Sequence, residues 1–222
     1  MRNDAPASYR AILRRVGLLL IVIGVLDVGY MIYCIVNGES YSSGLNIFAI
    51  VAGIFLIRGH LGAAGLVTWL SAFFAAALVA VLILLPLLQP LDLTLAQLRS
   101  DALSMIASLA EALVVAFVLI WIYRQLRLPA VVEARVAAGR SSSPPKSAFI
   151  LGAILMVTLA TALQLMLHSE SAAKAITLAE AQVGPGYKFH VWGIDWWADR
   201  VRADVTAYTP NEIKSVEVEW SR

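Results

Sequence analysis

The chain has 222 residues, of which 60% are hydrophobic and 14% are charged, and its formal net charge is +2. This composition is too apolar for an ordinary soluble domain, and the scattered basic residues exclude the concentrated cationic surface of a nucleic-acid-binding protein. The single cysteine, Cys34, excludes an internal disulfide and a cluster of thiolate metal ligands. We therefore expect an α-helical protein whose main partner is the lipid bilayer.

Long apolar stretches, separated by short polar or turn-forming segments, predict a bundle of five transmembrane helices. In chain order they are residues 16–36, 45–57, 61–88, 102–123 and 148–168. The first follows a basic tail and is longer than the apolar part of a signal peptide, so we expect an uncleaved signal anchor. The second is short, and Arg58 at its end would have to extend to the membrane interface. The last covers about 30 Å, one hydrocarbon core.

A short segment between the third and fourth stretches differs from the predicted spans. Residues 91–101 carry leucines at positions 91, 95 and 98, which lie on one side of a helix. We expect this segment to form a helix that lies in the membrane interface.

Lys and Arg are concentrated on one side of the predicted bundle. Four lie in the N-terminal tail, one is Arg58, and five lie in residues 124–146, whereas the connectors on the other side hold only Arg99. The positive-inside rule therefore predicts a cytoplasmic N-terminus and an external C-terminus. The strong preference for Arg, with only four lysines, fits a bacterial source. We expect a multi-pass protein of the bacterial inner membrane, with a periplasmic C-terminal part.

The polar region after the last predicted span defines a second domain. We divide the chain into a transmembrane region, residues 1–168, and a small α+β cap, residues 169–222. Residues 171–183 favour a helix that ends at the Gly-Pro-Gly sequence of 184–186. Three runs alternate apolar and polar residues as strands do, namely residues 187–194, 200–208 and 213–220.

This pattern predicts a helix packed on a three-stranded antiparallel meander. The cap has about 50 residues and no disulfide, which is below the size at which one core usually suffices. We therefore expect the sheet to lean on the membrane, on the outer loops or on another subunit, and this need for support is a physical reason to expect assembly.

Two acidic residues lie near the middle of predicted spans. Asp27 is 11 residues from the start of the first span and Glu111 is 12 residues from the end of the fourth, so both are about 16–18 Å deep. Such acids are costly in a membrane, so we expect both to face the bundle interior and at least one to hold a proton. Ser108, on the face of Glu111, and Gln164 are candidate hydrogen-bond partners. These polar residues either form a shared proton or cation site between helices or make interhelical hydrogen bonds that hold the bundle together. The second role is the commoner one.

Tryptophan is concentrated in the cap, which holds four of the six tryptophans in its last 31 residues. We expect Trp196 and Trp197 to occupy the loop between the first two strands. Together with Trp192, they either bind a partner or a lipid-borne ligand, or they lie in the headgroup layer, where tryptophan is favoured.

The sequence contains no motif of a hydrolase, zinc protease, nucleotide-binding or thiol-redox site, so we expect no catalytic residue, cofactor or metal. His190, Asp204 and Glu217 would form a row across the polar face of the sheet, where we expect a solvated surface. Our first interpretation is a non-enzymatic inner-membrane accessory, assembly or immunity-type protein whose periplasmic cap docks on a partner or on its own copy. The alternative is a small transporter or proton-coupled channel that uses Asp27 and Glu111.

Overall fold

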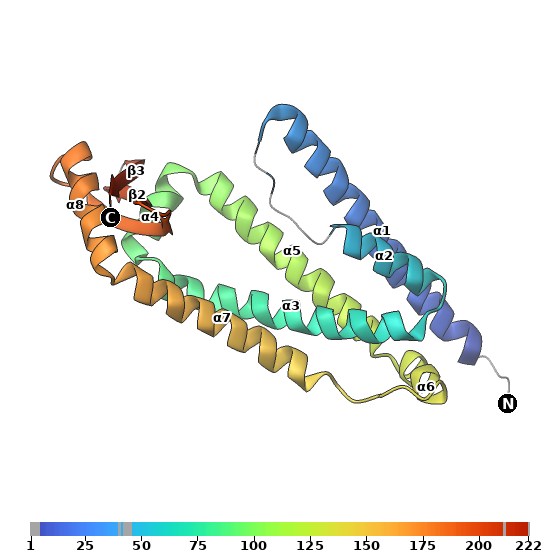
Figure 1. Ribbon diagram of the computed structural model, residues 1–222. Helices are drawn as coiled ribbons and strands as arrows, with labels where there is room; N and C mark the ends of the chain where they lie inside the picture. Colours follow the sequence, from blue (N-terminus) through green and yellow to red (C-terminus); the bar gives the residue numbers. More distant parts are fainter. Residues whose placement is uncertain (1–4, 40, 42–45, 211, 222) are drawn as a thin grey trace. The chain divides into compact units, whose positions relative to one another are not determined.

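The computed structural model describes residues 5–39, 41, 46–210 and 212–221 (Figure 1). Its helices are α1 (Ala5–Asn37), α2 (Asn46–Ile57), α3 (Leu61–Leu88), α4 (Leu91–Ser100), α5 (Ala102–Leu126), α6 (Pro129–Ala137), α7 (Lys146–Leu167) and α8 (Glu170–Val183). Its strands are β1 (Lys188–Trp196), β2 (Arg200–Tyr208) and β3 (Ile213–Ser221). The chain divides into two compact units, Met1–Ala76 with Ala116–Gly152, and Ala77–Val115 with Ala153–Arg222.

Four of the described helices are long and apolar enough to cross a membrane, namely α1, α3, α5 and α7. The prediction of a mostly helical chain with several helices able to span a membrane is confirmed in this form. The fifth predicted span corresponds to α2, which has 12 residues and is therefore only about 18 Å long. Because this length is less than one hydrocarbon core, the five-span count stays a prediction.

The first unit contains a close contact between α1 and α2. A Cβ atom on Gly17 would lie 2.6 Å from the carbonyl oxygen of Gly53, and a Cβ on Gly53 would lie 2.6 Å from that of Gly17. Only glycine allows two helix backbones to approach so closely. The apolar core around this pair draws on α1, α2, α3, α5 and α6. Its buried members are Leu13, Val16, Leu56, Ala64, Val67, Ile122, Leu126 and Val131.

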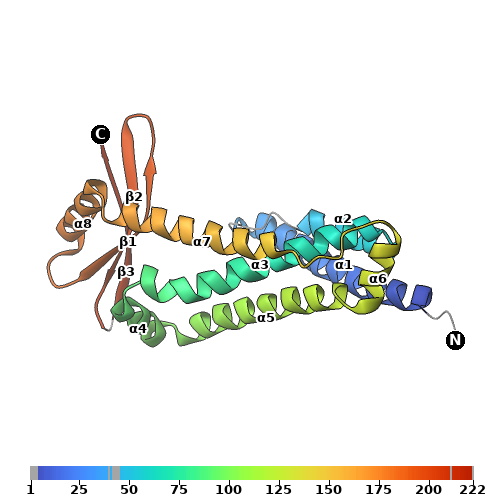
Figure 2. The same cartoon turned by 90° about the horizontal axis from the view of Figure 1, so that it is seen from below.

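The C-terminal sheet of the second unit is antiparallel with the order β1-β2-β3, which confirms the predicted meander. Helix α8 packs on one face of this sheet (Figure 2). It begins after Ser169, whose side chain accepts a hydrogen bond from the Ala172 amide, and it ends at Gly184 with φ of 93°. Small residues on α8 let it lie close to the strands. The buried core consists of Ala172, Ala175, Ala179, Val191, Ile194, Val201, Ala203, Val205, Ala207, Val216 and Val218.

Helix α4 belongs to the same unit and packs against the sheet near the β2–β3 turn. Leu93 and Ala96 of α4 form a small core with Tyr208 and partly buried Ile213. The predicted helix is present, and the leucines of its predicted row, Leu91, Leu95 and Leu98, are all exposed. The outer loops are one of the three supports expected for the sheet, but the sequence did not predict that the opposite side of this helix provides that support.

A β-bulge between Val191 and Gly193 changes the register of β1 against β2. His190, which comes before the bulge, lies opposite Thr206, whereas Asp204 lies opposite Gly193 on one side and Glu217 on the other. The predicted row of His190, Asp204 and Glu217 is wrong, because the strand register places His190 two residues along β2 from Asp204.

Candidate functional site

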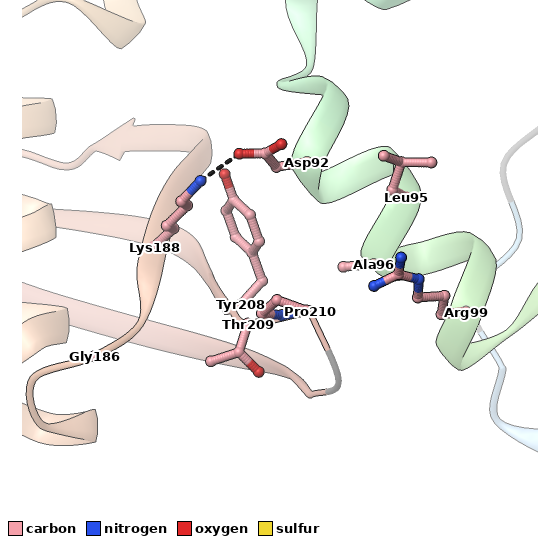
Figure 3. Close-up of a pocket in the computed structure, with 9 residues that line it drawn as sticks. All are labelled: Asp92, Leu95, Ala96, Arg99, Gly186, Lys188, Tyr208, Thr209 and Pro210. Atoms are coloured by element: carbon pink, nitrogen blue, oxygen red, sulfur yellow. Dashed lines mark hydrogen bonds and ion pairs between the residues drawn. The ribbon is translucent and has the colours of Figure 1, made fainter.

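A cavity of about 320 Å³ lies between α4 and the end of the cap sheet (Figure 3). Residues from three segments line it: Asp92, Leu95, Ala96, Arg99, Gly186, Lys188, Tyr208, Thr209 and Pro210. Helix α4 contributes one acid and one base on the same side, and β1 and β2 contribute a lysine and a tyrosine. The cavity exists because the Tyr208 ring, packed on Leu93 and Ala96, holds α4 at a fixed distance from the sheet.

Charge in this cavity is only partly balanced. Lys188 donates a hydrogen bond to Asp92 across the cavity, and this bond raises the pKa of Lys188 above its ordinary value. Burial raises the pKa of Tyr208, so its phenol stays a neutral hydrogen-bond donor at physiological pH. Arg99 forms no ion pair with any described residue. Because the charges of Asp92 and Lys188 cancel, the charge of Arg99 makes the cavity positive overall.

These groups provide charge and hydrogen-bond donors for a small anionic group, and no serine, cysteine or histidine is among the residues that line the cavity. Sequence reasoning missed Asp92, Lys188 and Tyr208. The available signal was weak: an acid in the first turn and an arginine in the last turn of a short amphipathic helix also suit the helix dipole alone.

A second cavity, of about 380 Å³, lies beside β1 in the same unit and contains Gln164, His168 and His190 among its lining residues. His168 Nδ1 lies 2.7 Å from the carbonyl oxygen of Gln164. Burial lowers the pKa of His190, whose ring meets the Trp192 ring edge-on at 5.0 Å between centroids. A neutral His190 is therefore expected at pH 7. Of the predicted intramembrane polar residues, only Gln164 lines this cavity.

The structure places Asp27 and Glu111, the two acids predicted near the middle of the membrane, in different units. Asp27 lies on α1 in the first unit and is half-buried, whereas Glu111 lies on α5 in the second unit and is exposed. The expectation that both acids face the bundle interior therefore stays a prediction. Ser108 is also exposed and donates its hydroxyl to the Ser104 carbonyl at 3.0 Å.

The three predicted interface tryptophans gather on or just after β1. Trp192 at the bulge donates its indole N–H to the Thr206 hydroxyl at 2.9 Å. Trp196 is the last residue of β1, so the predicted loop position holds only for Trp197. Their exposed fractions are 44% for Trp192, 51% for Trp196 and 70% for Trp197.

Comparisons with known proteins give no match: no protein-family model, no curated protein and no solved structure is similar to this chain. The chemistry of the described residues is therefore the basis for a functional proposal.

Proposed function

We propose that this chain is a non-enzymatic accessory, assembly or immunity-type protein of a bacterial inner membrane, and that its cap binds a partner protein in the periplasm. In this proposal α2 completes a set of five spans, with the N-terminus in the cytoplasm. The ten-to-one excess of Lys and Arg on one side of the spans supports this orientation.

The observation that carries the proposal is the row of exposed tryptophans on the edge of the cap sheet. In the described part of the chain β1 pairs only with β2, so its other backbone edge can accept a further strand. Trp192 and Trp196 belong to this strand and Trp197 follows it directly. Exposed tryptophans contribute more binding energy than most side chains. A strand edge flanked by them therefore suits an extended segment of a partner protein.

Helices α8 and α4 keep this edge in place. Helix α8 covers one face of the sheet, and Lys174 on α8 lies 5.5 Å from the centre of the Trp220 ring on β3. Helix α4 holds the other face through Leu93, Ala96 and Tyr208. A sheet fixed from both faces loses little conformational entropy when it binds, which favours affinity.

The transporter or proton-coupled channel is the alternative, and it depends on Asp27 and Glu111. A transported ion needs a cavity that reaches its binding groups. Neither acid is among the residues that line the two cavities described above, so this alternative depends on the position of the two acids in the sequence.

The proposal is tested by photo-crosslinking from position 197 in membranes of the native host. A photoreactive amino acid replaces Trp197 in the full chain, and the matched control places it at Thr177, which is exposed on α8. We expect a discrete adduct from position 197 only, and we expect Trp192→Ala to reduce it.

Two differently tagged copies of the chain identify the partner as a second copy if the adduct carries both tags. Equal adducts from positions 197 and 177, or none from position 197, would contradict the proposal.

A further inference from the structure

The connector between α5 and α7 contains a group of arginines that lies against the start of α3. A Cβ atom added to Gly65 would lie 3.1 Å from Nη2 of Arg135, and one added to Gly62 would lie 3.3 Å from Nη1 of Arg140. The two glycines thus leave room for both guanidinium groups on the first turns of α3. All four residues belong to the first unit.

Arg127 extends this group toward the loop before α7. Its Nη1 donates a hydrogen bond to the Ser142 carbonyl at 2.6 Å, which fixes the guanidinium in place. Arg127 and Arg140 both lie near enough to lower the pKa of Arg135, although burial is the larger cause. Three positive groups are therefore held in mutual repulsion.

No described acid neutralises these arginines. None of the three forms an ion pair with a described residue, and the Nε of Arg135 is buried without a hydrogen-bond partner. Residues 124–146 contain five basic residues and one acid, Glu133, which is exposed and lines another cavity. An unpaired buried donor on a charged group is costly. A bound anion would remove both the repulsion and the unpaired donor.

We propose that Arg127, Arg135 and Arg140 form a binding site for a phosphate group. The planar guanidinium presents paired N–H donors that match two oxygens of a phosphate, and several arginines together recognise a phosphate better than single lysines do. The site lies in a connector between apolar helices, where an anionic phospholipid headgroup would meet it. A soluble phosphate-bearing ligand offers the same chemistry, and the test separates the two sources.

This site belongs to the first unit, and its role depends neither on the cap nor on a partner protein. Its charge comes from residues that the positive-inside rule places in the cytoplasm, so the headgroup would be one of the inner leaflet.

The test measures the thermal unfolding of the purified full chain in a neutral detergent. Three probes are titrated separately: short-chain phosphatidylglycerol, phosphatidylcholine of the same chain length, and inorganic phosphate. We expect phosphatidylglycerol to raise the unfolding midpoint in a saturable manner and phosphatidylcholine to leave it unchanged. Arg140→Gln, at an exposed position, should weaken the apparent affinity about tenfold, the loss expected for one charged hydrogen bond.

Arg135→Gln should have an effect at least as large, and Arg135→Lys should retain part of the binding because it keeps the charge and loses the paired donors. Arg14→Gln is the matched control, because Arg14 is an exposed arginine of the same unit outside this group. If Arg135→Gln fails to fold, Arg140→Gln alone decides the matter.

A saturable response to phosphatidylglycerol alone assigns the site to a lipid headgroup, and a saturable response to inorganic phosphate assigns it to a soluble phosphate ligand. No saturable response to either probe, or an equal loss in Arg14→Gln and Arg140→Gln, would overturn the proposal.

Discussion

The C-terminal sheet and the α1–α2 pair pack by different rules. Along β2, buried Val201, Ala203 and Val205 alternate with exposed Arg202 and Asp204, so polarity alone separates the inside from the outside. Along α1, apolar residues occupy both positions: Val16 is fully buried, whereas Val22 and Val25 are more than half exposed. Small residues mark the contact between the helices there, because Gly17 of α1 lies against Gly53 of α2.

The difference follows from the solvent. Water drives apolar side chains together, so a strand with one wet face shows which residues are buried. Lipid tails are as apolar as the side chains, so helices in a membrane associate through small residues that allow close packing. Each of these two packing rules can be tested by one substitution at the contact and a matched control substitution away from it.

The largest effect is expected from Val205→Asp in the cap. The new carboxylate would lie in the fully buried core between the sheet and α8 without a partner. This costs about 3 kcal/mol or more, a large share of the stability of a small domain. Limited proteolysis of the full chain in detergent should show a cap that is cut rapidly.

The neighbouring substitution Asp204→Asn provides the control on the opposite face. Asp204 is exposed and lies opposite Glu217, so removing its charge should be neutral or slightly favourable. If both variants resist the protease equally, the assignment of the two faces is wrong.

The next effect is expected from Gly17→Ala and Gly53→Ala. Each added methyl group would collide with a backbone carbonyl of the other helix at 2.6 Å, and the helices must separate to admit it. Such overpacking costs about 1–3 kcal/mol. The unfolding midpoint of the full chain in detergent should fall for both variants.

Gly29→Ala is the matched control on the same helix, because a Cβ atom there would meet nothing within 4 Å. It should leave the midpoint unchanged or raise it slightly, since alanine favours helix more than glycine. A similar fall in all three variants would show that the α1–α2 contact is not special.

The same difference in packing rules explains how much of this fold the sequence could predict. The period-two pattern of the cap located all three strands, the Gly-Pro-Gly sequence located the end of the helix that packs on them, and long apolar stretches located the four described helices that are able to cross a membrane. Inside the predicted spans the apolar pattern could not show which face is buried, so the inward orientation expected for Asp27 and Glu111 stays a prediction.

The candidate sites depend on contacts between distant segments. Lys188 reaches Asp92 only because α4 packs on the sheet, and Arg135 meets Gly65 only because the fold brings two segments about 70 residues apart in the sequence together. The bulge at Trp192 has no sequence signal beyond the following glycine, yet it decides which residues lie opposite one another. The leucine pattern of residues 91–101 showed one apolar side of the helix. It did not show that Leu93 and Ala96, on the other side, contact the sheet.

A smaller effect is expected from Trp220→Ala, which tests the edge of the cap core. Trp220 is half-buried, packs at the margin of the core and lies under Lys174 of α8. Its loss should cost about 2 kcal/mol, below the usual range for a fully buried tryptophan. Trp197→Ala, at a position 70% exposed, should leave the resistance of the cap to protease unchanged. Equal resistance of the two variants would show that Trp220 is not part of the core.

The smallest effect is expected from Glu111→Gln. This variant tests whether the Glu111 carboxyl group transports protons or only makes hydrogen bonds. Glu111 shares one exposed side of α5 with Ser104 and Ser108, so its carboxyl group faces lipid or another helix. An amide can still donate and accept hydrogen bonds. We therefore expect Glu111→Gln to insert, to fold and to give the same adduct from position 197 as the wild type, whereas Glu111→Leu should reduce any association that this side provides. The decisive measurement is proton flux in vesicles that contain a pH-sensitive dye. A wild-type flux that is lost in a folded, inserted Glu111→Gln protein would place transport before docking, because only a conducting site needs the carboxyl group to exchange its proton.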